Sequence, residues 1–202
     1  NNRVYCMMED SRGRRWIGTG NGIVILDLPE NDLLMLRAEN ESEFRINSNM
    51  VYSIMQDRDN EIWIATSEGL NKFDMKNQQM TSFRNDPESQ NTLCNNFTIS
   101  LCEDKLGYIW IGTGSGLNRF SKKDSSFLYF SREKGLPSVI IYDIIEDNKK
   151  SLWFTTGRGL VSMDPEMAEN SRFSEIDPLK GQEFNIKAVH KSEEGELFFG
   201  GM

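Results

Sequence analysis

The sequence has no long apolar run, few cysteines and a single histidine. Its longest apolar stretches, at 22–26 and 139–142, fall far short of the roughly 20 residues of a membrane-spanning helix, so no direct membrane insertion is expected. The three cysteines form no C-x-x-C pair and lie beside no histidine, which leaves no readable disulfide framework or zinc site. With His190 alone, no Ser/His/Asp or Cys/His set can be assembled, and we assign no catalytic residue.

Positive charge is also scarce. The chain has 23 Lys and Arg against 31 Asp and Glu, which gives a net charge of −8. Because binding to phosphates needs a basic face, this balance argues against a nucleic-acid-binding module. Hydrophobic residues nevertheless make up 38% of the chain, with 16 glycines in addition, which is typical of a packed globular protein and not of a disordered one.

What the sequence does contain is an internal repeat, marked by its four tryptophans at positions 16, 63, 110 and 153. They are separated by 47, 47 and 43 residues, and Phe198 continues the series after 45 more. Six residues before each tryptophan stands an aspartate, at positions 10, 57, 104 and 147, and six residues after it stands a glycine, at positions 22, 69, 116 and 159. Repeats of about 40–50 residues with an aromatic signature indicate propeller blades or helical repeats.

The pattern within each repeat predicts strands. We expect a first strand over 51–56 and over 141–146, a second over 109–113, a third over 117–121 and a fourth over 127–130, separated by turns rich in Gly, Asp and Asn. The second strand is apolar on both alternating faces, as in Ile62–Ala65, whereas the fourth is mostly polar, as in Met80–Arg84. Radially arranged blades produce this gradient, because their inner strands are buried between neighbouring sheets. The prediction is an all-β fold, a partial β-propeller of four-stranded antiparallel blades.

The repeats place blades at about 1–47, 48–94, 95–138 and 139–183, followed by the first hairpin of a fifth at 184–202. The fifth copy has Ser192 in place of the aspartate and Phe198 in place of the tryptophan. From the first strand to the fourth every copy has the same length, so the period varies only in the connection to the next repeat. Variable loops on a fixed scaffold are where binding sites are usually built.

The third repeat carries the string IWIGTGSGLNRF at 109–120, preceded by Asp104 and Gly107. It resembles the two-component regulator propeller repeat, most closely in 61–74 and 108–121, and least in the fifth copy. The resemblance implies about four and a half blades of a larger, seven-bladed ring in the periplasmic sensor region of a hybrid histidine kinase. It also implies a ligand from glycan breakdown, control of carbohydrate-utilisation genes, and a phosphorelay whose catalytic module lies elsewhere, so that this segment is not itself an enzyme. With no signal peptide before Asn1, we expect a processed or excised piece.

Three segments that look like chemical motifs have structural interpretations. Gly18–Gly22 and Gly112–Gly116 do not fit G-x-G-x-x-G and open no helix, so we expect turns. Asp57–Glu61 lacks the glycine and the distal glutamate of an EF-hand, so no metal and no cofactor are expected. The repeated aspartate should accept backbone N–H groups in a tight hairpin, and the repeated tryptophan should lie in the core.

The candidate ligand contacts lie on the side that carries the turns between second and third strands and the connections between repeats. The turn tips present four polar residues that all differ, namely Asn21, Glu68, Ser115 and Arg158. Just before the first strand, one position is held by Asn2, Asn49 and Asn96. Asn amides suit hydroxyl-rich ligands, although Asn is also an ordinary turn residue. We predict contacts from Asn21, Asn49, Glu68, Asn96, Ser115 and Arg158 to a carbohydrate-type small ligand.

Two other functions remain open. A propeller lyase or hydrolase of the streptogramin-lyase type would need clustered catalytic histidine and a metal. A protein-interaction scaffold similar to the WD-repeat class would need no specific ligand.

Whichever function holds, four and a half blades leave the apolar lateral faces of the first and last blades without neighbours. Because such faces are unusual in monomers, we expect self-association through open blade faces or strand edges.

Overall fold

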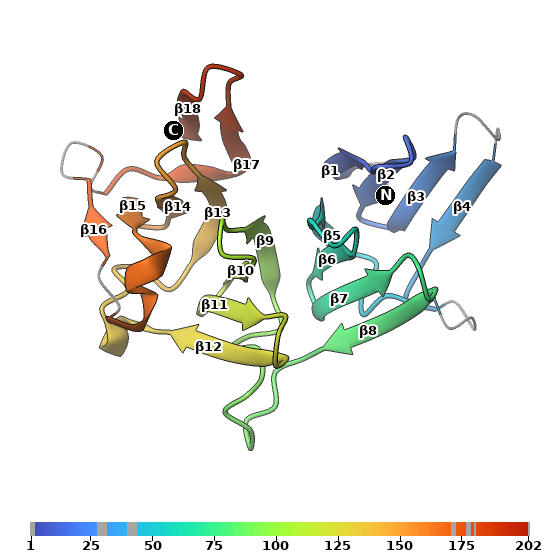
Figure 1. Cartoon of the computed structure of the whole chain (residues 1–202), viewed down its shortest axis with the longest axis horizontal. Helices are drawn as coiled ribbons and strands as arrows, with labels where there is room; N and C mark the ends of the chain where they lie inside the picture. Colours follow the sequence, from blue (N-terminus) through green and yellow to red (C-terminus); the bar gives the residue numbers. More distant parts are fainter. Residues whose placement is uncertain are drawn as a thin grey trace. The chain divides into compact units, whose positions relative to one another are not determined.

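The computed structural model describes residues 3–27, 32–39, 44–170, 173–176, 179 and 181–201. It contains four four-stranded sheets and one two-stranded hairpin, and each sheet is made of strands that follow one another in the sequence (Figure 1). The all-β prediction is confirmed. In the described part of the chain, no helix is long and apolar enough to cross a membrane.

The chain folds as two compact units. The first contains residues 1–85 and 96–98, and the second contains residues 86–95 and 99–202. The first unit holds one sheet of β1 (Val4–Glu9), β2 (Arg15–Thr19), β3 (Gly22–Asp27) and β4 (Asp32–Leu36). It also holds a second sheet of β5 (Val51–Gln56), β6 (Ile62–Thr66), β7 (Gly69–Asp74) and β8 (Gln79–Phe83).

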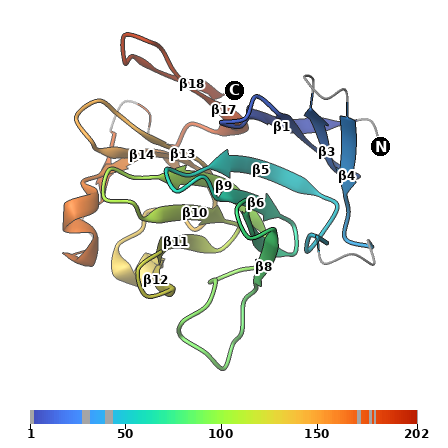
Figure 2. The same ribbon diagram turned by 45° about the vertical axis from the view of Figure 1, so that its right-hand side comes forward.

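The second unit holds the remaining sheets, apart from the first residue of β9. The third sheet consists of β9 (Thr98–Glu103), β10 (Ile109–Thr113), β11 (Gly116–Ser121) and β12 (Ser126–Phe130). The fourth consists of β13 (Ile141–Glu146), β14 (Leu152–Thr156), β15 (Gly159–Met163) and β16 (Ser174–Glu175). A hairpin of β17 (Phe184–Lys191) and β18 (Leu197–Gly201) follows (Figure 2).

The fourth sheet differs from the predicted pattern at its last strand. β16 has only two residues, because the 3₁₀ helix η2 (Pro165–Asn170) occupies much of the chain between β15 and β16. Pro165 suits the first helical position, where its fixed φ fits and its missing N–H leaves nothing unsatisfied. The Oδ1 of Asp164 accepts the backbone N–H of Glu166 at 3.0 Å. A second short 3₁₀ helix, η1 (Arg132–Lys134), follows β12.

The core of the first unit lies between its two sheets. Trp16 and Ile23 of the first sheet form one buried cluster with Val51, Ile54 and Ile64 of the second. All five residues of β6 are buried, whereas β8 is partly or fully exposed. The predicted gradient from apolar inner strands to polar outer strands is therefore confirmed in the second sheet.

The second unit repeats this arrangement. Trp110 stacks on Phe130 of its own sheet, with ring centroids 5.5 Å apart, and meets Phe154 of the fourth sheet at 6.1 Å. Of the repeated aromatic residues in this unit, Trp110 is buried and Trp153 is half-buried. At the fifth position Phe198 is 54% exposed, because no further sheet in the described chain covers the β17–β18 hairpin.

The repeated aspartate has two partners, of which the sequence predicted one. In each of the four sheets its Oδ1 accepts a backbone N–H four residues on, at 2.8–3.0 Å, which confirms the hairpin role. Its Oδ2 also accepts the indole N–H of the tryptophan six residues on, at 2.7–2.9 Å. Burial alone would raise the pKa of Asp10, but hydrogen bonds from Trp16, Arg14 and Arg12 lower it overall. The constant six-residue offset is the sequence signal of this bond.

The first sheet has an uncovered apolar side on β1. Val4 is 52% exposed and Met7 is 73% exposed, whereas their equivalents in the second sheet, Val51 and Ile54, are at most 8% exposed. A hollow of about 380 Å³ lies on this side, lined by Met7, Met8, Glu9, Arg15, Ile17 and Leu26. In the second sheet, Val51 and Ile54 are covered by the apolar face of the first sheet. A similar apolar face of a β-sheet would therefore fit against Val4 and Met7.

We propose that a second copy of the chain covers this side, since about 25 cal/mol is gained per Å² of apolar surface removed from water. Light scattering at micromolar concentration should show dimers or larger species. Met7→Glu should shift the chain toward monomer, and Leu106→Glu should not, because Leu106 is an exposed leucine in the second unit. A wild-type chain that stays monomeric under these conditions would contradict the proposal.

Candidate functional site

The turns between second and third strands share one geometry. In each, the threonine that ends the second strand donates its Oγ1 to the carbonyl of a glycine three residues on, at 2.7–2.9 Å. The same Oγ1 accepts the backbone N–H of the turn-tip residue. The glycine has a positive φ, from 96° at Gly22 to 147° at Gly116, which side-chain-bearing residues rarely adopt. The prediction that these segments are turns is confirmed.

The four predicted turn-tip residues are all exposed. Asn21 and Glu68 belong to the first unit, and Ser115 and Arg158 to the second. Their side chains form no hydrogen bond or ion pair with any described residue. The turns therefore present free polar groups in four chemical types, a hydroxyl, an amide, a carboxylate and a guanidinium, all of which remain predicted ligand contacts.

The two predicted asparagines before the first strands are engaged within the fold. Asn49 accepts the backbone N–H of Ala38 at 2.9 Å and donates to the Glu39 carboxylate at 2.7 Å. Asn96 accepts the backbone N–H of Asn85 at 2.7 Å. Each thus holds together the two ends of a connection between sheets. Their ligand contact stays a prediction, and Asn2 lies outside the described residues.

Three tyrosines that the sequence analysis missed occupy β-bulges near these turns. Along β1, β5 and β13 the pairing skips one residue, so that Tyr5, Tyr52 and Tyr142 have no partner on the neighbouring strand. A bulge re-aims the side chain of its extra residue, and bulges are common beside functional sites. The signal in the sequence is a tyrosine eleven residues before the tryptophan in three of the four repeats, with Ile99 in the remaining one.

In the first unit the bulged tyrosines belong to a row of rings. Tyr5 and Tyr52 have centroids 5.3 Å apart, and Phe97 lies edge-on to Tyr52 at 5.1 Å. The guanidinium carbon of Arg3 lies 5.1 Å from the Tyr5 centroid. The backbone carbonyl of Arg3 accepts the backbone N–H of Gly20 at 3.2 Å, which places this row beside the turn that carries Asn21.

In the second unit Tyr142 lies close to the turn that carries Arg158. A β-carbon built on Gly157 would lie 3.6 Å from both the Tyr142 hydroxyl and the Ser138 hydroxyl. The backbone N–H of Gly157 donates to the carbonyl of Ile140 at 3.3 Å. The half-buried Tyr142 and the free guanidinium of Arg158 therefore lie at this end of the fourth sheet, with the buried Ser138 beneath them.

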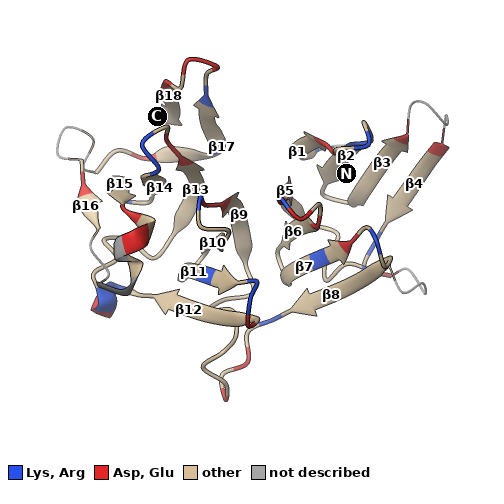
Figure 3. Ribbon diagram, viewed as in Figure 1, with Lys and Arg blue, Asp and Glu red and all other residues tan. Residues whose placement is uncertain are grey.

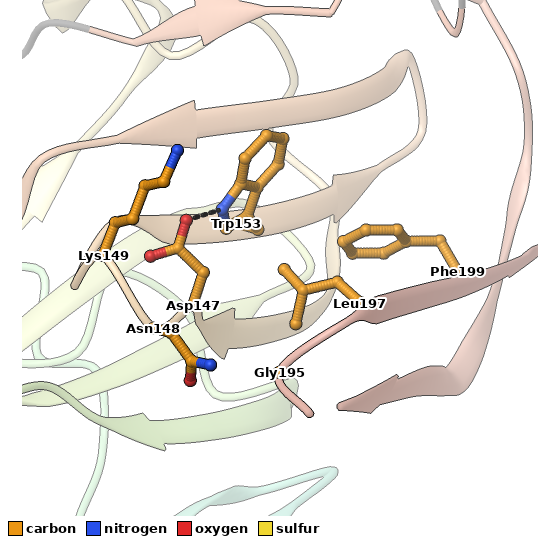
Figure 4. Close-up of a pocket in the computed structure, with 7 residues that line it drawn as sticks. All are labelled: Asp147, Asn148, Lys149, Trp153, Gly195, Leu197 and Phe199. Atoms are coloured by element: carbon orange, nitrogen blue, oxygen red, sulfur yellow. Dashed lines mark hydrogen bonds between the residues drawn. The ribbon is translucent and has the colours of Figure 1, made fainter. Parts of the chain in front are cut away.

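A separate hollow lies at Trp153, toward the hairpin between β13 and β14 (Figure 4). It measures about 380 Å³ and is lined by Asp147, Asn148, Lys149, Trp153, Gly195, Leu197 and Phe199. In the first unit the corresponding space beside Trp16 is occupied by Phe73, a residue of the third strand of the next sheet, at 6.2 Å. The β17–β18 hairpin has no such third strand in the described chain, which accounts for the hollow.

The described residues offer little for catalysis or metal binding. Among them no group of three or more His, Cys, Asp or Glu could hold a metal ion. Burial raises the pKa of the Cys94 thiol to about 11 and that of Cys102 to about 12, the latter with the help of Glu146, Asp104 and Asp143. These thiols are protonated at neutral pH and are poor nucleophiles. Basic and acidic residues are interspersed along the strand ends and connections (Figure 3).

The sequence profile of the family described as two component regulator propeller matches four segments, residues 1–21, 45–68, 92–115 and 135–158. Each of the four-stranded sheets thus carries one match to the two-component regulator propeller repeat. Each matched segment ends in or just after a turn between a second and a third strand, so the propeller repeats contain both the repeated aspartate and the repeated tryptophan. No curated protein sequence matches the chain.

Solved structures show the same fold. The extracellular domain of BT4673 from B. thetaiotaomicron, described as a hybrid two component system, is 24% identical with a TM-score of 0.83, covering 99% of this chain and 28% of that one. The extracellular domain of the hybrid two component system BT3049 from the same organism is also 24% identical, with a TM-score of 0.77 and coverage of 98% and 26%. Virginiamycin B lyase from Staphylococcus aureus is 15% identical, with a TM-score of 0.71 and coverage of 99% and 64%. These likenesses confirm a partial β-propeller.

Proposed function

We propose that the chain is a ligand-binding segment of the extracytoplasmic, periplasmic sensor region of a hybrid two-component histidine kinase. The observation that carries this proposal is the match of the propeller repeats in four segments along the chain. Two of the similar structures are described as extracellular domains of hybrid two component systems. Because the chain spans less than a third of those structures, the activity of the whole sensor is part of the proposal.

The proposed ligand is a fragment of a glycan, and the regulated genes are those for carbohydrate use. Support comes from the turn tips, whose free amide, hydroxyl, carboxylate and guanidinium groups match the mixed donors and acceptors of a sugar. The half-buried tyrosines beside them add apolar surface with a polar tip. Such a combination suits a ring that carries both C–H and O–H groups.

In this proposal the segment binds and does not catalyse. The propeller lyase remains as an alternative because its fold is shared, and the fold alone carries no activity. The single histidine, His190, is exposed on β17, and the thiols of Cys94 and Cys102 have raised pKa values. Histidine phosphorylation would take place in a separate module of the full-length sensor.

The test is Arg158→Ala in the full-length sensor, with transcription of the regulated genes as the readout. We expect the half-maximal ligand concentration to rise about tenfold or more, since a hydrogen bond from a charged group is lost, with no loss of folding stability. Lys123→Ala is the matched control, because Lys123 is exposed in the turn at the opposite end of its sheet. An unchanged response, or a bound ligand that touches only the hairpins at 57–61 and 104–108, would overturn the site.

A further inference from the structure

The ring row of the first unit, made of Arg3, Tyr5, Tyr52 and Phe97, is a candidate site in its own right. Consecutive centroids lie 5.3 Å and 5.1 Å apart, with interplanar angles of 54° and 83°. The first pair is tilted and the second is edge-to-face, and rings in contact at such distances hold one another in place. The two tyrosines are half-buried, whereas Arg3 and Phe97 are exposed. The fold therefore holds the middle of the row, and its two ends are accessible to a ligand.

The polar groups of this row have no partners among the described residues. Neither tyrosine hydroxyl forms a hydrogen bond there, and Arg3 forms no ion pair. Burial raises the pKa of Tyr52, and the neighbouring Tyr5 raises it further, while Arg3 opposes both. The Tyr52 phenol is therefore protonated at neutral pH and can donate a hydrogen bond. The site offers a cation and two hydroxyl donors, and none of the described residues accepts a hydrogen bond from them.

The direction of the two tyrosine side chains is set by the backbone at equivalent irregularities in the two sheets. Tyr5 and Tyr52 are both the extra residues of β-bulges, at equivalent positions of neighbouring sheets. Without the bulge, the alternation of a strand would place the residue in the ordinary inner or outer series. Two equivalent bulges therefore bring two phenols to the same end of the unit, beside the turns of Asn21 and Glu68.

We propose that this row binds the carboxylate of an acidic sugar, a uronic acid unit, with Arg3 and the phenols as donors and the rings against the C–H groups of the pyranose. An excess of donors with one fixed positive charge selects an anionic acceptor. The adjoining rings add an apolar contact that an inorganic anion could not use. This inference rests on the proposed function, because it names the class of glycan fragment that the sensor would bind.

The test is calorimetric titration of the full chain with α-1,4-linked trigalacturonic acid and with α-1,4-linked galactotriose, which has a hydroxymethyl group in place of each carboxylate. We expect the acidic sugar to bind at least tenfold more tightly. Arg3→Gln should weaken it about tenfold or more and Tyr52→Phe several-fold, and both should change the neutral sugar less than twofold. Arg119→Gln is the matched control, because Arg119 lies over another tyrosine ring, that of Tyr108, at 4.2 Å, and should change neither.

Tyrosine-selective labelling locates the site. The chain has five tyrosines, so Tyr→Phe variants assign every ring signal in an NMR spectrum. Trigalacturonic acid should shift the signals of Tyr5 and Tyr52 and leave those of Tyr108 unchanged. Shifts confined to Tyr129 and Tyr142 would overturn the location.

The outcomes separate this inference from the proposed function. If both sugars bind equally and Arg3→Gln has no effect, the acidic site is wrong and a glycan sensor stands. If inorganic sulfate displaces the acidic sugar at an equal concentration, the two ligands have similar affinities. The row is then a simple anion site, and the sugar assignment is wrong. If neither sugar binds or shifts a tyrosine signal, the inference is overturned, while the Arg158→Ala response decides the proposed function independently.

Discussion

Trp110→Ala is expected to lower the free energy of unfolding by about 3–5 kcal/mol, since it leaves a cavity that the sheets cannot close. The Trp110 side chain is fully buried, with Phe130 on its own sheet and Phe154 on the next one as ring partners. The mutation also leaves the Asp104 carboxylate without the indole N–H that it accepts at 2.7 Å. Equilibrium denaturation in urea measures the change.

Trp153→Ala provides the comparison, because this indole makes the same hydrogen bond, at 2.8 Å to Asp147, but is only half-buried beside a hollow. It should cost clearly less than Trp110→Ala. A loss below about 1 kcal/mol for Trp110→Ala would show that the ring is not packed between sheets.

Asp10→Ala is expected to cost about 3 kcal/mol, as the removal of one partner from a buried ion pair does. The Asp10 side chain has no exposed surface, and its carboxylate accepts from the Trp16 indole, the Arg14 guanidinium and two backbone N–H groups. Without it, four donors lose their acceptor at once. Asp32→Asn is the control, since among the described residues this exposed carboxylate accepts only the backbone N–H of Leu33, and the substitution should change stability little.

Acid titration gives the same site a second signature. Because the pKa of Asp10 is lowered in the folded chain, its contribution is complete above the ordinary carboxyl value near 4 and is lost as the pH falls below it. Asp10→Asn should therefore reduce the slope of stability against pH in that range. An equally steep slope in Asp10→Asn would show that other carboxylates carry the acid sensitivity.

The strands are predictable because the same pattern recurs in every repeat. Val51–Gln56, Ile109–Thr113 and Ile141–Glu146 begin and end where the sequence placed them, since buried inner strands have the strongest apolar pattern. The outer strands are more exposed and have a weaker apolar pattern. Near Phe173, a proline and an aspartate nucleate a 3₁₀ helix, and a local turn preference outweighs the weak pattern of an edge strand.

The candidate site was predictable only in part. Exposed turn tips such as Asn21 and Arg158 follow from their place in the repeat, and their free side chains fit that interpretation. The engagement of Asn49 and Asn96 with distant backbone groups depends on how two ends of a loop meet in space. The bulges that direct Tyr5 and Tyr52 are likewise a property of strand pairing, to which a single sequence gives no direct access.

Because each four-stranded sheet holds one tryptophan of the set Trp16, Trp63, Trp110 and Trp153, the chain carries an intrinsic fluorescent reporter in every one of them. Three of the indoles are fully buried and the fourth is half-buried, so their emission differs in sensitivity to solvent. Retaining one tryptophan at a time, with phenylalanine at the other three positions, would resolve the unfolding of the chain sheet by sheet. Repeat architectures unfold through nearest-neighbour steps, and here the order of those steps can be read optically without any added label.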